Sequence, residues 1–308
     1  MSKNLNLKAV LGSTKIDFLK NSKITFYFSA ILVVLSILLV VFRGLNLGID
    51  FSGGILMEAR FDEKVDVAKF RDFIRDDEMG ELVIQNFDEN TILIKVSADK
   101  ERENQVEVVQ AIKSKIEQFY GFVDYRKVDF VGPQIGSELI FKGIAALALG
   151  LILVMLYIWI RFDWQFGIGA ILALLHDVIL TFGFFALTNL EFNLSSIAAI
   201  LTVIGYSIND SVVIFDRVRE NLRKYKKMEI VKLLNLSINS TLSRTILTAG
   251  TTLLALLSLI LFGGEVLLSF ACAMFFGVVI GTYSSIYIAA PFLMRFDFKS
   301  LKKEDLDE

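Results

Sequence analysis

The sequence has few of the residues that enzymes and disulfide-stabilised proteins depend on. It contains one cysteine, Cys272, and one histidine, His176, so an intrachain disulfide is excluded and a serine or cysteine triad has only His176 to draw on. No Gly-x-x-x-x-Gly-Lys-Ser/Thr loop and no cluster of metal ligands with usable spacing is present. The sequence therefore predicts no enzyme, no bound metal and no organic cofactor.

An excess of charge of one sign is also missing. The 32 Lys and Arg residues are balanced by 34 Asp and Glu, for a formal net charge of -2, which excludes the strongly basic face of a nucleic-acid-binding protein. Proline is rare as well, with only 2 residues. Apolar residues dominate instead, since 54% of the chain is hydrophobic and 27 residues are Phe. This composition predicts a membrane protein.

Six apolar segments are long enough to cross the hydrocarbon core of a bilayer, at about 1.5 Å per helical residue. They lie at 24–42, 139–160, 167–187, 194–215, 242–262 and 266–294. The first is an uncleaved span, because Arg43-Gly44-Leu45 follows it in place of a small-residue cleavage site. An even number of spans predicts that both termini lie on the same side of the membrane.

Basic residues indicate which side that is. Lys and Arg number five in residues 1–23, one at Arg161, seven from Arg217 to Lys232 and four from Arg295 to Lys303, whereas the connections 188–193 and 263–265 have none. By the positive-inside rule the basic segments are cytoplasmic. Residues 1–23 and 295–308 are therefore predicted to be cytoplasmic tails of a multi-pass membrane protein. Within the transmembrane bundle of 139–294, the basic stretch at about 216–235 is predicted to be an amphipathic helix along the inner membrane surface.

Residues 43–138, between the first two spans, are predicted to form a periplasmic domain. Strand patterns occupy 56–61, 82–87, 91–97 and 123–131, and helical patterns occupy 65–78 and 103–120. The order βαββαβ is that of a ferredoxin-like domain. The fold class is thus a polytopic α-helical membrane protein with six transmembrane helices and one external ferredoxin-like α+β domain. The glycine cluster Gly48–Gly54 is interpreted as a tight entry into the sheet that opens a strand and not a helix.

Two charges within apolar spans are the first candidates for function. Asp210 and Arg244 each lie about six residues, roughly 9 Å, inside the cytoplasmic boundary of spans 4 and 5, so an ion pair between these spans is geometrically feasible. Desolvation favours a neutral acid and a guanidinium favours a carboxylate, and these opposing effects can poise Asp210 to exchange a proton. Arg244 keeps its charge and acts as a counter-charge. The alternative is a static pair that fixes helix register.

Other polar residues in the spans are weaker candidates. Tyr206, Ser207 and Asn209 precede Asp210 and are predicted to form a supporting polar face that can hold water, although hydrogen bonds between helices explain such residues equally well. His176 and Asp177 lie near the middle of span 3. As neighbours they point about 100° apart on a helix, so both facing one site is not expected. A proton relay and a structural polar contact stay equally open for this pair.

Four motifs together resemble the SecF proteins of the SecD/SecF family, which belongs to the RND superfamily. They are GIDFSGG (48–54), VGPQIGSEL (131–139), GYSINDSVVIFDRVREN (205–221) and TLSRTI (241–246). The resemblance covers nearly the whole chain, and the family's intramembrane Asp and Arg fall on Asp210 and Arg244.

The resemblance implies an accessory subunit of the Sec protein translocase in the bacterial inner (plasma) membrane. Such a subunit forms a heterocomplex with SecD and uses the proton motive force to help draw unfolded preprotein out of the SecYEG channel after SecA has driven it in. The coupling ion is H⁺ or Na⁺. Two alternatives remain open at this stage: half of an RND-type small-molecule exporter, and an assembly subunit that does not itself drive transport.

Overall fold

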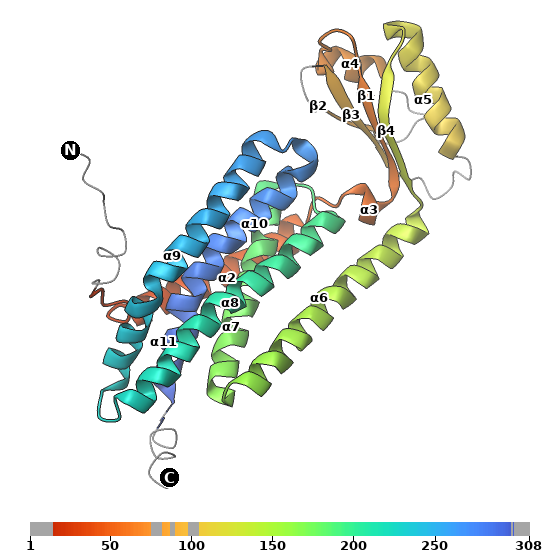
Figure 1. The fold of residues 1–308 in the computed structure, drawn as a ribbon. Helices are drawn as coiled ribbons and strands as arrows, with labels where there is room; N and C mark the ends of the chain where they lie inside the picture. Colours follow the sequence, from red (N-terminus) through yellow and green to blue (C-terminus); the bar gives the residue numbers. More distant parts are fainter. Residues whose placement is uncertain (1–14, 75–81, 87–89, 98–104, 297, 299–308) are drawn as a thin grey trace, which may run out of the picture. The chain divides into compact units, whose positions relative to one another are not determined.

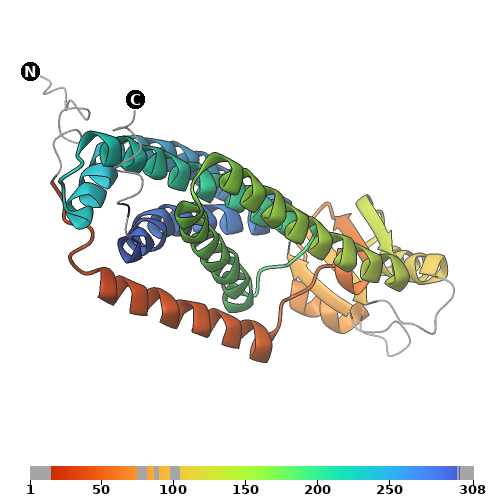
Figure 2. The same ribbon diagram turned by 90° about the horizontal axis from the view of Figure 1, so that it is seen from below.

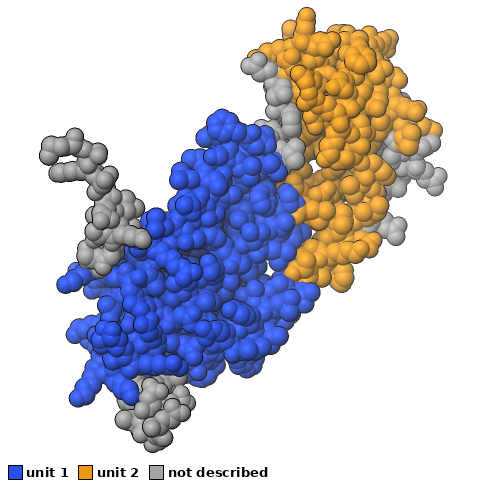
Figure 3. All heavy atoms as spheres, in the orientation of Figure 1, with its two compact units in different colours: residues 1–45, 147–190, 195–308 blue, residues 46–146, 191–194 orange. Residues whose placement is uncertain are grey.

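The structure, a computed structural model, describes residues 15–74, 82–86, 90–97, 105–296 and 298. The chain divides into two compact units, shown in Figure 3: a helical unit of residues 1–45, 147–190 and 195–308, and an α/β unit of residues 46–146 and 191–194. Most of the residues predicted as cytoplasmic tails, 1–14 and 299–308 among them, lie outside the described part of the chain.

Six helices among the described residues are long and apolar enough to cross a membrane (Figure 1). The six predicted spans are therefore confirmed. The helices are α2 (Ser22–Arg43), α6 (Pro133–Arg161), α7 (Trp164–Thr188), α8 (Leu194–Lys224), α9 (Ile230–Phe262) and α10 (Glu265–Ser284). The last continues through a π-helical segment, η1 (Ser285–Ala289), into the short elements α11 (Ala290–Phe292) and η2 (Leu293–Arg295).

The basic stretch 216–235 is helical at both ends, as predicted, but it does not form one helix. Residues 216–224 continue α8 without a break, and α9 begins at Ile230. A buried apolar stripe holds both extensions together, since Val218 and Leu222 of α8 pack in one core cluster with Leu233 and Leu234 of α9. The basic side chains therefore lie at the adjoining ends of two long helices that pack against each other.

The α/β unit has the predicted ferredoxin-like order. Its elements are β1 (Gly54–Arg60), α4 (Val67–Ile74), β2 (Leu82–Asn86), β3 (Thr91–Ser97), α5 (Gln105–Tyr120) and β4 (Asp124–Val131). The strands form one sheet in the order β2-β3-β1-β4, and every neighbouring pair is antiparallel. The predicted end of the first helix, 75–78, lies outside the described residues.

Alternation along the strands explains this unit's core. Met57 of β1 pairs with Ile94 of β3, and both side chains are buried against Phe70 of α4 and Ile112 of α5. Because successive strand residues point to opposite faces, the same strands leave their other face outside this core. A register shift between Glu58 and Ala59 opposite β4 marks a bulge at one edge of the central strand.

The entry into this unit differs from the prediction. Gly48 and Gly53 flank a one-turn helix, α3 (Ile49–Ser52), so the glycine cluster forms a helical turn before the strand begins. Gly53 and Gly54 both have positive φ, 73° and 131°, a region that side chains with a Cβ rarely occupy. This glycine pair therefore lets the chain reverse from α3 directly into β1.

The helical unit is packed through small residues. Any Cβ at Gly183 of α7 would collide with Ser36 of α2, and one at Gly277 of α10 would collide with Val203 of α8. Gly277 and Gly281 form a Gly-x-x-x-Gly spacing, which is typical of close helix packing, and a Cβ at Gly281 would crowd Ser207 of α8. In Figure 2, α2 lies along one edge of the helical unit, and α7 and α10 lie between it and α8 and α9.

Candidate functional site

A fully buried carboxylate lies in the middle of α7. Asp177 is 0% exposed, and its Oδ2 accepts hydrogen bonds from Ser207 Oγ of α8 at 2.5 Å and from Ser284 Oγ of α10 at 2.8 Å. Its Oδ1 lies 2.9 Å from Nδ1 of His176, and Nδ1 donates because the carboxylate can only accept. Three helices therefore meet at one acidic side chain.

A second carboxylate lies on α8 and is less buried. The Oδ1 of Asp210 accepts a hydrogen bond from Thr245 Oγ1 of α9 at 2.5 Å, and its Oδ2 accepts one from Ser285 Oγ of η1. The Asp210 side chain is half-buried. Asp210 thus joins α8 to α9 and to the π-helical segment through hydroxyl donors.

Two adjacent serines connect these carboxylates. Ser284 donates to Asp177 and Ser285 donates to Asp210, at the junction where α10 passes into the π-helical segment. Consecutive residues point about 100° apart on a helix, so these two neighbouring hydroxyls can donate to two different acids. Single π-helical turns inside α-helices are frequent at functional sites because they change the register of the helix.

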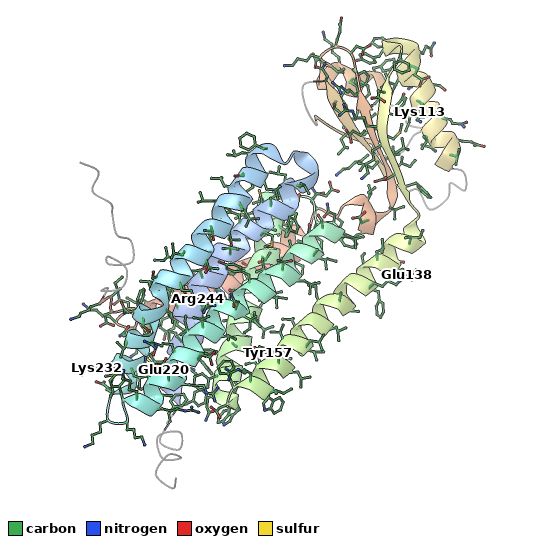
Figure 4. All side chains as sticks on the ribbon, in the orientation of Figure 1. Lys113, Glu138, Tyr157, Glu220, Lys232 and Arg244 are labelled. Carbon is green, nitrogen blue, oxygen red and sulfur yellow. The ribbon has the colours of Figure 1, made fainter. Side chains whose placement is uncertain are left out.

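Arg244 does not pair with Asp210. Its side chain is exposed on α9 (Figure 4), and among the described residues no carboxylate forms an ion pair with it. The next residue, Thr245, makes the contact with Asp210 instead. The two spans do meet at Asp210, but through a hydroxyl rather than a guanidinium.

The predicted polar face around Asp210 divides into three environments. Ser207 is buried and donates to Asp177, not to Asp210. Tyr206 is half-buried and hydrogen-bonds to Thr252 of α9, and Asn209 is exposed. Ser207 therefore departs from the predicted face, whereas Tyr206, Asn209 and Asp210 share one side of α8 because they are spaced three and four residues apart.

His176 and Asp177 do face one site, contrary to the expectation. His176 is 5% exposed and Asp177 is fully buried. Although adjacent residues point in different directions on a helix, the two side chains are joined by a hydrogen bond between His176 Nδ1 and Asp177 Oδ1. The Nε2 atom of His176 is buried with no hydrogen-bond partner among the described atoms.

Three hydroxyl residues of the site escape sequence analysis. Thr245 follows Arg244 within a quoted motif, and its position beside that charge was the available signal. Ser284 and Ser285 give no such signal, because polar serines in apolar spans are common and the π-helical turn is invisible in the sequence. Within the described ranges, no three His, Cys, Asp or Glu side chains are grouped to hold a metal ion.

Two segments of the chain match models of known protein families. Residues 111–299 match the model for the C-terminal region of the protein export membrane proteins SecD/SecF, and residues 38–65 match the SecD/SecF GG motif. The latter includes the Gly53-Gly54 pair with positive φ. The chain belongs to the SecD/SecF family. It is of the SecF kind, because its curated relatives carry that name.

Relatives of similar length support this placement in the SecD/SecF family. The protein translocase subunit SecF of Rickettsia felis is 48% identical over 303 residues, which cover 98% of each chain. The SecF subunit of Rickettsia akari is 49% identical over 292 residues and 94% of each chain. The chain is therefore a multi-pass membrane protein of a family that serves protein translocation.

Solved structures of the SecD/SecF family share the fold. A crystal structure of SecDF from Thermus thermophilus, described as a translocon-associated membrane protein, matches with a TM-score of 0.80 and 37% identity over 92% of this chain. SecDF in a super-membrane-facing form matches with a TM-score of 0.70 and 35% identity over 96% of the chain. The chain spans only 39% and 40% of those two proteins.

Proposed function

We propose that this chain is the SecF half of a SecD–SecF heterocomplex that uses the proton motive force to promote late steps of preprotein export across the bacterial inner membrane. In this proposal SecA drives the unfolded preprotein through the SecYEG channel, and the heterocomplex draws it outward. The main support for this proposal is the position of Asp210, an acid that lies within a membrane-spanning helix and accepts hydrogen bonds from two other segments. Acids at membrane depth are costly and commonly carry ions or protons.

Protonation of Asp210 changes what the site can hold together. The ionised carboxylate only accepts hydrogen bonds, whereas the protonated acid also carries an O–H donor that needs a partner of its own. The hydroxyl of Thr245 or Ser285 that faces the protonated oxygen then meets a weaker acceptor. This change in hydrogen bonding favours a different packing of α8, α9 and the π-helical segment. A proton that descends 100 mV supplies about 2.3 kcal/mol, which shifts a two-state equilibrium by more than about tenfold.

Exposed polar groups on α8 and α9 support the heterocomplex. Arg244, Thr248 and Asn209 are exposed within spans that are otherwise apolar, and such groups are expensive against lipid. A second bundle that covers this face removes the cost. In the proposed complex SecD supplies that bundle, and Arg244 becomes a counter-charge at the interface, close to Asp210.

Asp177 and His176 are proposed as a second, inner part of the proton pathway. The adjacent hydroxyls of Ser284 and Ser285 lie between the two acids, so a change at Asp210 reaches Asp177 through one short backbone segment. His176 holds the far side of Asp177. All the residues of this inner part of the pathway belong to this chain, and none is supplied by SecD.

The test compares preprotein export from cells that contain wild type or Asp210→Asn at equal abundance, with and without an uncoupler. Asn keeps the volume and loses the titration, so we expect the uncoupler-sensitive part of export to fall at least tenfold while SecA-dependent export continues. Asp216→Asn is the matched control, because Asp216 lies on the same helix but is exposed and paired with Arg161.

Three outcomes decide the proposal. Wild-type export by Asp210→Asn shows that the acid is structural and that the proposed coupling is wrong. An equal defect in Asp216→Asn shows a general loss of charge on α8. Export that follows an imposed sodium gradient rather than a proton gradient replaces H⁺ by Na⁺ and leaves the role of Asp210 intact.

A further inference from the structure

The helical unit has a groove whose lining includes His176 of α7. It has a volume of about 660 Å³ and is formed between the first half of α2, α7 and the segment 287–295. Its walls are mainly apolar, with Phe26, Val33 and Val34 on α2 and Leu172 on α7. The lining on α2 extends from Ser22 to Val34, about 18 Å at 1.5 Å per residue.

The lining of the groove includes both buried and exposed side chains, with Ser29 and His176 among the buried ones. Several of its lining side chains are exposed, with Tyr27 at 66%, Val34 at 55% and Leu172 at 40%. They belong to spans whose length and hydropathy fit a membrane. In a bilayer these exposed side chains face hydrocarbon chains, so an apolar chain is the natural occupant.

Two cationic groups mark one end of the groove. Lys23 stands at the start of α2 and Arg295 at the end of η2, and both line the cavity. Neither forms an ion pair with a carboxylate among the described residues. The Arg295 guanidinium lies 5.5 Å from the ring of Phe26 and 5.9 Å from that of Phe292, which holds the charge at the groove mouth.

We propose that this groove binds one anionic phospholipid, with its phosphate at Lys23 and Arg295 and an acyl chain along α2. Basic pockets between transmembrane helices on the cytoplasmic side bind anionic lipid headgroups, and the positive-inside rule assigns both residues to that side. Charge complementarity at one end and an apolar channel of helical length at the other select a phospholipid over a purely apolar or purely ionic ligand.

The lipid site has a structural consequence for α2. This helix packs on α7 and on the π-helical segment, and few of its residues are buried. Tyr283 ties it to α10 through Ser29 Oγ at 2.9 Å and the Thr25 carbonyl at 3.3 Å. A lipid in the groove fills the remaining space and fastens the first half of α2 to the bundle.

Native mass spectrometry of the full-length chain in detergent micelles tests the site, with added phosphatidylglycerol, phosphatidylcholine or inorganic phosphate. We expect wild type to retain one phosphatidylglycerol at least tenfold more tightly than phosphatidylcholine. Replacing both Lys23→Gln and Arg295→Gln removes that preference, since each basic residue contributes to anionic lipid binding. The matched control, Lys226→Gln with Lys227→Gln, has the same charge change between α8 and α9 and keeps it.

A second variant tests the apolar half independently. Ala30→Trp fills the groove from α2 without altering charge, and we expect it to lose bound phosphatidylglycerol as well. Equal retention of the two lipids, or unchanged retention in both groove variants, shows that the proposal is wrong. Displacement by millimolar inorganic phosphate shows a simple anion site. Cross-linking of Ala30→Cys to another polypeptide in membranes shows that a protein helix occupies the groove.

Discussion

The two units of the chain treat polar and apolar side chains in opposite ways. In the α/β unit the buried residues are mainly apolar, as Met57, Phe70 and Ile94 illustrate at 0% exposure. In the helical unit the fully buried residues include Asp177, Ser207 and Ser284, while the outer surface carries exposed Ile, Leu and Phe side chains. The difference reflects two solvents, because water rewards apolar burial and lipid rewards the internal pairing of polar groups.

The contrast has a mechanical meaning. Apolar cores are held by contact area and are close-packed, so they resist change. Polar contacts in a lipid environment are few and specific, and each depends on the protonation of its partners. A unit that buries its acids can therefore change shape with proton occupancy, whereas the apolar core of the α/β unit does not depend on protonation.

The largest effect is expected from breaking the buried polar cluster. Asp177→Ala removes the acceptor of three buried donors, at about 1–3 kcal/mol for each unpaired group, so we expect a loss of about 4 kcal/mol in the free energy of unfolding. Unfolding of the full chain in detergent, followed by fluorescence of its 2 Trp residues, measures it. Asp216→Ala removes an exposed acid and is expected to cost under about 1 kcal/mol. Equal losses show that Asp177 is hydrated.

A smaller effect is expected from a matched pair of isoleucines. Ile94 of β3 is fully buried and Ile152 of α6 is 53% exposed. Ile94→Ala opens a cavity and is expected to cost about 3 kcal/mol, whereas Ile152→Ala is expected to cost less than about 1 kcal/mol. Hydrogen exchange of the sheet and helix amides in the full chain measures both. A large loss at Ile152 shows instead that a partner packs on that face of α6.

The smallest effect is a pH dependence confined to the α/β unit. Burial raises the pKa of Tyr125 to about 12, and the negative charge of Glu117 adds to the shift. Because the folded state holds this proton more tightly, the stability it contributes is complete below the ordinary pKa of 10.0 and declines as pH rises toward about 12. The difference in absorbance at 295 nm between wild type and Tyr125→Phe measures the titration. A midpoint near pH 10 shows that the phenol is solvated.

Much of the fold follows from local patterns. Six long apolar stretches predict six spanning helices, and the alternation of strand and helix patterns predicts the ferredoxin-like order, because both depend on short-range periodicity. The helical turn at Ile49–Ser52 was missed, because one turn is too short for a period to show. The helical character of 216–224 is predicted, but the break between Lys224 and Ile230 is not, because charged residues continue through it without a Pro or Gly.

The candidate site divides along the same line. The sequence by itself singled out Asp210, Arg244 and Asp177, because a charge in an apolar span is visible without any structure. The tertiary structure alone decided their partners: Thr245 beside Asp210, Ser284 beside Asp177, and an exposed Arg244. The depth of a residue in a spanning helix depends on how many residues separate it from the end of the span, and this number can be read from the sequence. Which face meets which neighbour depends on how helices cross and on a π-helical turn, and these are set by packing among segments far apart in the chain.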